Sequence, residues 1–136
     1  MKVFGTLWII IILTALCIGC SNKGAGDKTA ADPEQIALTE NILLYFQQEQ
    51  FDKIVEHFDA RMKLSLNKEQ LAVVWAQLST QVGTYTKSEF HSAQKINNAA
   101  DMIVYTCYFG SQKLYFQLVF GKDNQVRGMY FKPQPN

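Results

Sequence analysis

Hydrophobic and polar positions divide the chain into four stretches of different character. Residues 3–19 are apolar or small and carry no charge. Residues 21–31 are mostly small or polar and have no periodicity, which is typical of a flexible tether with a mean reach of roughly 20 Å. Over residues 33–83 apolar positions recur with the helical period of about 3.6, and beyond residue 83 they alternate with a period of about 2. The pattern therefore predicts helices first and strands second.

Three helices are expected before residue 83. The first begins at Asp32, which can cap it, and a proline follows at the position that helices tolerate best. A short second helix is indicated by the apolar spacing within residues 51–58. The third is the clearest, because Asn67 and Gln70 match a capping box and Gly83 suits its end. Its apolar stripe, which we expect in the core, is Leu71, Val74, Trp75, Leu78 and Val82.

Four strands are expected after residue 83, at residues 84–94, 102–109, 113–120 and 126–132. Turn-forming residues rich in Gly, Asn and Asp separate them. Along 113–120, Leu and Phe alternate with polar or mixed residues, so one face of the sheet is strongly apolar and the other is mixed. This order favours an α+β fold in which three N-terminal helices pack on one face of a four-stranded antiparallel sheet.

The start of the chain has the features of a secretion signal: the positive charge of Lys2, an apolar segment and the small Gly19. Its ending, Gly19-Cys20, resembles the lipobox of bacterial lipoproteins, with Cys17 where such boxes usually carry leucine. The resemblance implies that residues 1–19 are a signal peptide, that cleavage falls before Cys20, and that Cys20 is acylated. Two alternatives stay open. One is an uncleaved anchor, since 17 residues are at the lower end of what spans a bilayer; the other is ordinary cleavage without lipid.

A lipid on Cys20 implies a location in the cell envelope, on the extracytoplasmic side of a membrane. Ser21 at the next position favours the outer membrane where the host has one. The chain then divides into a lipoprotein signal peptide over residues 1–19, the lipidated cysteine with its tether over 20–32, and one α+β domain over 33–136.

The charges of the domain are balanced. Lys2 is the only charged residue before Cys20, so the rest of the chain carries twelve basic and twelve acidic side chains. A net charge near zero argues against nucleic acid or another polyanion as the main partner. Apart from Cys20, only Cys107 remains, which leaves no intramolecular disulfide once Cys20 is acylated. Stability must then come from packing.

The sequence shows no arrangement of metal ligands or cofactor-binding residues. His57 and His91, the only two histidines, have no second ligand at metal-binding spacing. Cys107 is in phase with apolar residues of its strand, so we expect a buried and inert thiol. Phosphate loops and dinucleotide fingerprints do not occur. We therefore expect neither a metal nor a cofactor.

The segment from residue 48 to residue 85 carries a resemblance to a known family. The residues that carry it are Phe51, Asp52, Val55, Phe58, Asp59, Met62, Leu71, Trp75, Leu78, Gly83 and Tyr85. They resemble the bacterial domain of unknown function 3887, and the resemblance extends loosely over residues 34–132. It implies a cone-like fold similar to nuclear transport factor two and the cystatins, on secreted proteins and lipoproteins, and no established chemistry. In some members an α/β-hydrolase follows; its Gly-x-Ser-x-Gly motif is absent here.

Asp59 is the one weak catalytic candidate. The resemblance places it where cone-shaped folds often open a pocket, and some enzymes of that fold set an acid or base against Tyr hydroxyls in an apolar cavity. Tyrosines for this role are Tyr85, Tyr105, Tyr108, Tyr115 and Tyr130. The competing interpretation is structural: Asp59 caps the turn over residues 60–62 or pairs with Arg61.

The mixed face of the predicted sheet is the better place for a partner. Tyr115, Gln117 and Val119 align on it, and such a row can contact a peptide, a glycan or another subunit. Exposed Tyr on a strand is also explained by β propensity alone. The leading hypothesis is a lipid-anchored, extracytoplasmic, non-catalytic module that binds a small ligand, a peptide or a protein partner, including a second copy of itself, through the concave surface of the cone or the exposed face of the sheet. The alternatives are a small enzyme using Asp59 with a Tyr hydroxyl, and an assembly component whose sheet face is covered by a larger complex.

Overall fold

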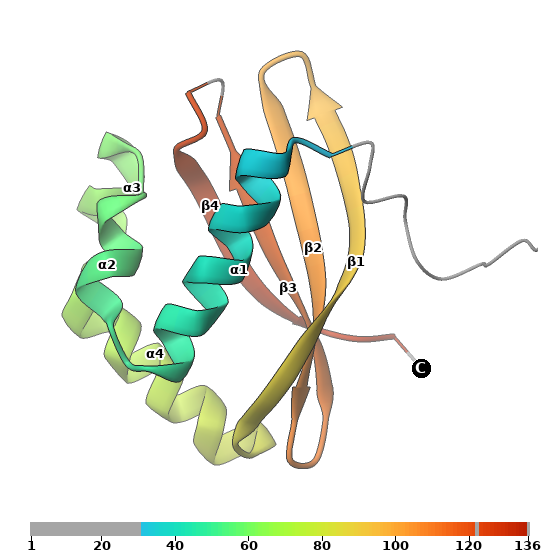
Figure 1. The fold of residues 1–136 in the computed structure, drawn as a ribbon. Coiled ribbons are helices and arrows are strands. Elements are labelled where there is room, and N and C mark those ends of the chain that lie inside the picture. Colours follow the sequence, from blue (N-terminus) through green and yellow to red (C-terminus); the bar gives the residue numbers. More distant parts are fainter. Residues whose placement is uncertain (1–30, 122, 136) are drawn as a thin grey trace, which may run out of the picture.

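The computed structural model describes residues 31–121 and 123–135. The predicted signal peptide, Cys20 and almost all of the predicted tether lie outside these ranges. The helices are α1 (Pro33–Gln47), α2 (Phe51–Glu56), α3 (Ala60–Ser65) and α4 (Lys68–Val82), and the strands are β1 (Tyr85–Asn97), β2 (Ala100–Phe109), β3 (Lys113–Phe120) and β4 (Val126–Pro133). The described part is therefore α+β, with the helices before the sheet, as predicted (Figure 1). None of the helices in these ranges has the length and apolarity needed to cross a membrane.

The prediction of three helices was wrong, because the described residues form four. The missed helix, α3, is only six residues long and buries a single side chain, Met62. One buried position produces no periodic pattern, so hydrophobic spacing cannot reveal such a helix. Its signal is the cap instead. Asp59 precedes the helix in an extended conformation, and its Oδ1 accepts a hydrogen bond from the Met62 amide at 2.8 Å.

The two long helices begin as their sequences predict. At α1, Asp32 accepts a hydrogen bond from the Glu34 amide at 2.9 Å, with Pro33 at the first position. At α4, Asn67 and Gln70 form a complete capping box, in which each side chain accepts from the other residue's amide.

The end of α4 is joined closely to the turn between β2 and β3. Gly83 ends the helix with a φ of 91°, and a Cβ at this position would lie 3.0 Å from the Gly110 amide nitrogen. Both the conformation and the space therefore favour glycine. The Ser111 amide donates to the Val82 carbonyl at 3.1 Å, and the Ser111 hydroxyl donates to the same oxygen at 2.9 Å. These contacts fix where α4 meets the sheet.

The sheet is an antiparallel meander in the order β1-β2-β3-β4. Irregularities in the pairing of β1 with β2 fall at Tyr85/Lys87, Phe90/Ser92 and Lys95/Asn97. Bulges of this kind bend a strand and increase its twist. Figure 1 shows the consequence, a curved sheet with all four helices on one side. The other side of the sheet carries no helix among the described residues.

The core lies between the helices and the apolar face of the sheet. Phe46 is at its centre, 1% exposed, with its ring centroid 4.8 Å from that of Trp75 on α4 and 6.0 Å from that of Phe116 on β3. Trp75 is a core residue, as predicted, but Val74 of the same predicted stripe is 46% exposed, so its expected place in the core was wrong. The sheet contributes the alternate residues of β3 expected from the sequence, which are Leu114, Phe116, Leu118 and Phe120.

We expect Phe46→Ala to lower the free energy of unfolding by about 3–5 kcal/mol. The substitution removes a ring that contacts both α4 and the sheet, and it leaves a cavity among rigid aromatic neighbours. Leu44→Ala is the matched control on the same helix, since Leu44 is 44% exposed; its cost should stay below about 1 kcal/mol. Urea unfolding followed by circular dichroism measures both. Equal losses in the two variants would contradict this account of the core.

Candidate functional site

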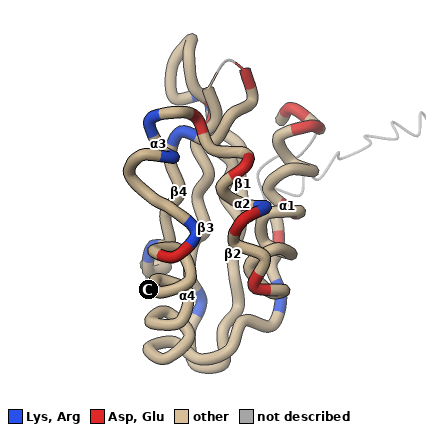
Figure 2. The backbone as a smooth tube through the Cα atoms, turned by 90° about the vertical axis from the view of Figure 1, so that its left-hand side faces the viewer, with Lys and Arg blue, Asp and Glu red and all other residues tan. Residues whose placement is uncertain are grey.

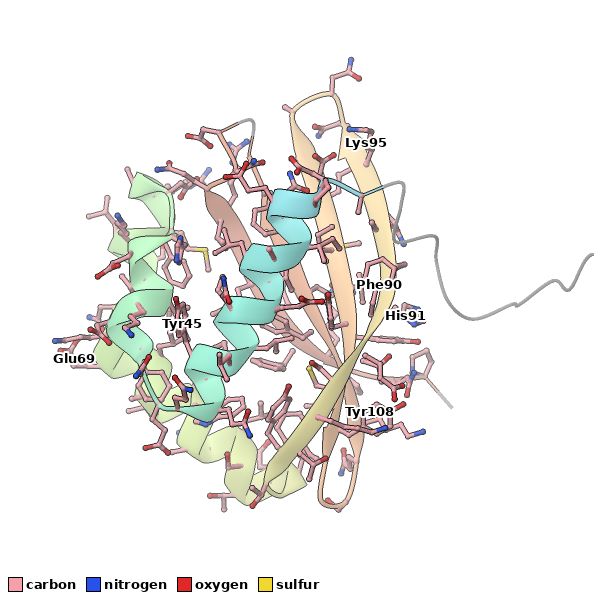
Figure 3. The ribbon with its side chains drawn as sticks, viewed as in Figure 1. Tyr45, Glu69, Phe90, His91, Lys95 and Tyr108 are labelled. Carbon is pink, nitrogen blue, oxygen red and sulfur yellow. The ribbon has the colours of Figure 1, made fainter. Side chains whose placement is uncertain are left out.

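The face of the sheet turned away from the helices is the main candidate site, and we call it the open face. In Figure 3, His91 and Tyr108 project on this side, whereas Phe90 lies on the side of the helices, where its ring packs against that of Tyr105. Cross-strand pairing defines the residues of the open face. They are Lys87, Glu89, His91, Ser92 and Gln94 on β1; Met102, Val104, Thr106 and Tyr108 on β2; Lys113, Tyr115, Gln117 and Val119 on β3; and Gly128, Tyr130 and Lys132 on β4.

The three residues predicted to bind a partner lie together at the centre of this face. Tyr115, Gln117 and Val119 alternate along β3, and each is half-buried. Towards β4 they pair with Lys132, Tyr130 and Gly128 respectively. The sequence pattern thus placed these side chains on the correct face. Whether they bind a partner stays a prediction.

An extra residue in β1 shapes the middle of the open face. His91 stands at the irregularity between Phe90 and Ser92, and its ring centroid lies 4.6 Å from that of Tyr115. These residues belong to β1 and β3, strands whose backbones are about 10 Å apart because β2 runs between them. Their rings must therefore lean over β2. This explains why Val104 and Thr106, on a face without a helical cover, are only 3% and 7% exposed.

Gly128 makes room for an aromatic ring on the β4 side. A Cβ at Gly128 would lie 3.0 Å from Cε2 and 3.1 Å from the hydroxyl of Tyr130, so only glycine permits this ring to lie along the strand. Tyr130 remains 50% exposed, and the Lys132 ammonium lies 5.4 Å from the centroid of its ring. The result is a flat aromatic surface with a cation beside it.

A second group of charged and aromatic side chains occupies the end of the open face near the β2–β3 turn. The Tyr108 ring lies between two ammonium groups, at 4.5 Å from Lys87 and 5.0 Å from Lys113. Glu89 accepts hydrogen bonds from Lys87 and from the Tyr108 hydroxyl, both at 2.7 Å. A hollow of about 660 Å³ adjoins this group, between the turn and Pro133–Pro135.

Mutual hydrogen bonding shifts the protonation of this group. The bond to Glu89 raises the pKa of Lys87 and the pKa of Tyr108 above their usual values. The bonds from Lys87 and then from Tyr108 lower the pKa of Glu89. Lys87 and Glu89 are thus both charged at neutral pH, and the Tyr108 hydroxyl is a donor rather than an acid.

Asp59 lies at a structural position. One carboxylate oxygen caps α3, and the other lies 3.6 Å from Nε of Arg127, not beside Arg61. The backbone there is tied to the start of β4, because the Asp59 amide donates to the Val126 carbonyl at 2.9 Å. This tie brings Arg127 and Asp59 together although they are far apart in sequence. Asp59 does not line any of four hollows of about 370–660 Å³ that are formed by residues within 31–121 and 123–135.

Three hydrogen bonds that join α1 to β2 and to the β3–β4 turn were missed by sequence reasoning. The buried Tyr105 donates a hydrogen bond from its hydroxyl to Oε1 of Glu40 at 2.6 Å. Burial, and then the Glu40 carboxylate, raise the pKa of Tyr105 strongly. Near the start of α1, the buried Gln35 side chain donates to Asp101 at 3.1 Å and to Asn124 at 2.9 Å. Because these partners are 65 to 89 positions apart, no local pattern signals them.

The residues considered for metal binding or thiol chemistry do not converge. His57 ends α2, His91 is on the open face and Cys107 is on the apolar face of β2. Within the described ranges, no group of three His, Cys, Asp or Glu residues could hold a metal ion. Cys107 is buried, as predicted, and desolvation raises the pKa of its thiol to about 12.

A comparison with known protein families identifies the family of this chain. The family described as Protein of unknown function (DUF3887) matches the chain over residues 39–129, from the first half of α1 to Met129 of β4. The chain belongs to this family. The range matched to DUF3887 includes α2, α3, α4 and most of the open face, so the sequence resemblance is confirmed. Comparisons with curated proteins and with solved structures gave no match.

The buried thiol of this DUF3887 domain predicts a loss of stability at high pH. In the unfolded chain Cys107 ionises near its ordinary pKa of 9.0, but in the folded chain only near 12. Folding therefore retains a proton that the unfolded chain releases, so stability falls as pH rises from about 9 towards 12. The slope attributable to Cys107 approaches about 1.4 kcal/mol per pH unit.

Urea unfolding at pH values from 8 to 10 tests this expectation, because Tyr105 ionises in the unfolded chain only towards the upper end of that range. In Cys107→Ala the slope below pH 10 should become shallower, even though the variant starts from a lower stability. An unchanged slope would show that the thiol is accessible to water in the folded chain.

Proposed function

We propose that this DUF3887 protein is a lipid-anchored, extracytoplasmic module without catalytic activity, which binds a small ligand, a peptide or a protein partner through the open face of its sheet. The observation that carries the proposal is the open face itself. It combines exposed or half-buried Tyr side chains with Lys and amide side chains, and no described helix covers it. Amphipathic aromatic rings beside charged groups are typical of binding surfaces.

The structure of the open face supports binding over catalysis. Its side chains form a broad surface rather than an enclosed chamber, and its best-defined charges already neutralise each other in the contact of Lys87 with Glu89. The alternative enzyme would need the Asp59 carboxylate to face a substrate. Both Asp59 oxygens instead lie against protein groups, the Met62 amide and the Arg127 guanidinium. The curvature of the sheet around its helices supports the further proposal that the fold is cone-like.

The lipid anchor rests on the Gly19-Cys20 ending of the apolar segment. Cells grown with labelled palmitate should incorporate label into the full chain, and Cys20→Ala should abolish that label, because it removes the sulfur that would be acylated. Cys17→Leu is the matched control, since it removes a neighbouring thiol but supplies the leucine that such boxes usually carry, so labelling should stay intact. Undiminished labelling of Cys20→Ala would overturn the anchor.

A photoreactive amino acid at position 117 tests binding at the open face in intact cells. Gln117 is at the centre of the face, and Glu69, exposed on α4 on the helical side, is the matched control position (Figure 3). We expect an adduct from position 117 at several times the yield obtained from position 69. A protein adduct would identify a partner, and a cross-linked dimer of the chain would identify homodimerisation. Equal low yields at both positions would contradict the proposal.

A further inference from the structure

We propose that the ligand of the open face is the anionic headgroup layer of the membrane, so that the domain lies with its sheet against the lipid surface. The inference rests on the proposed function in one respect, the attachment of the chain to a membrane near Cys20. It commits the open face to one occupant. A polypeptide partner at the same face would leave the proposed function standing and would overturn this inference.

The charges of the domain are separated across the sheet. On the helical side, residues 32–82 carry eight carboxylates, three lysines and one arginine, a net charge of −4, with most of the acidic positions along α1 and α2 (Figure 2). On the open face three lysines accompany one carboxylate, a net charge of +2. A body with little net charge but separated charges turns its positive side towards a negatively charged surface. The separation therefore selects which face meets an anionic bilayer.

The side chains of the open face suit the headgroup region of a bilayer. Lys113 contacts the Tyr108 ring and Lys132 contacts the Tyr130 ring, so each cation lies on an aromatic support at the surface. Tyr rings prefer this boundary because they are apolar in body and polar at the hydroxyl. Each lysine close to an anionic surface shifts the binding equilibrium by roughly fivefold. Because Glu89 neutralises Lys87, the net charge of +2 comes from Lys113 and Lys132, which together shift the equilibrium by roughly 25-fold.

The point at which the described chain begins agrees with this orientation. Ala31 lines a hollow of about 400 Å³ together with Ala93 and Lys95 of β1, and β1 is an edge strand of the sheet (Figure 1). The ten residues between Cys20 and Ala31 span at most about 35 Å when fully extended. Neighbouring layers of a domain are about 10 Å apart, so this length passes easily around the β1 edge to a membrane against the open face. The length of the tether therefore permits the open face to contact the membrane but does not by itself require this contact.

A second basic region provides an internal comparison. Arg61, Lys63 and Lys68 lie around α3 on the helical side, next to Leu64, which is 90% exposed. Among the described residues, no aromatic ring is found against these three cations, and Glu69 lies 4.0 Å from Lys68. A membrane held against α3 would turn the open face outward. Protection of the open-face lysines and protection of the lysines near α3 therefore indicate opposite orientations of the domain on the membrane.

The test is lysine labelling of the full chain reconstituted in vesicles. Two preparations are compared, phosphatidylcholine alone and phosphatidylcholine partly replaced by phosphatidylglycerol, at low salt and with a membrane-impermeant amine reagent read by mass spectrometry. We expect Lys113 and Lys132 to be labelled several-fold more slowly with phosphatidylglycerol, while Lys63 and Lys68 are labelled equally in both. Added salt should remove the difference, because it screens the attraction.

Matched variants sharpen the result. Lys113→Gln should weaken the protection of Lys132 by roughly fivefold, and Lys63→Gln should leave it unchanged. Equal labelling of Lys132 in both vesicles would overturn the inference, as would protection of Lys63 and Lys68 instead. Protection that increases with the ratio of protein to lipid but does not depend on phosphatidylglycerol would show that the open face binds a second copy of the chain. Palmitate labelling at Cys20 is measured separately, so failure of the anchor and failure of the docking remain distinguishable.

Discussion

The packing of Phe46 between the helices and the sheet is the contact on which the rest of the structure depends. Its ring meets Trp75 of α4 on one side and Phe116 and Phe131 of the sheet on the other, so one side chain of α1 joins three elements. Aromatic contacts of this kind bury large apolar areas and restrict the angle between layers. In a domain without a described disulfide, this cluster and its neighbours must hold the helices to one face of the sheet.

A candidate site on the opposite face follows from that arrangement. With a single helical layer, a four-stranded sheet can bury only one face, and the side chains of the other remain available. The fold then has to keep this face ordered without a cover. It does so with side chains that lie over the backbone of the strands: His91 with Tyr115 over β2, and Tyr130 along β4 over Gly128. The surface is therefore preformed, which lowers the ordering cost of binding.

How much of the fold and of the candidate site the sequence could predict depends on how far apart along the chain the interacting residues lie. Alternation along β3 was enough to place Tyr115, Gln117 and Val119 on one face, and the capping box fixed the start of α4. The helix α3 was not predicted, because its sequence signal is a single capping residue rather than a periodic pattern of apolar positions. The contacts of Glu40 with Tyr105 and of Gln35 with Asp101 were not predicted, because tertiary structure alone brings these residues together.

The charged end of the open face shows that composition does not reveal where on the surface the charges lie. Equal numbers of acidic and basic residues argued against a polyanionic partner, but that argument treats the charges as evenly mixed. The alternation of β1 and β3, the register of the sheet and the bulge beside Tyr85 set Lys87, Tyr108 and Lys113 in one row across three strands. A shift of one residue in either pairing would move a lysine to the apolar face. The basic surface is therefore a property of the register, and it exists only in the folded chain.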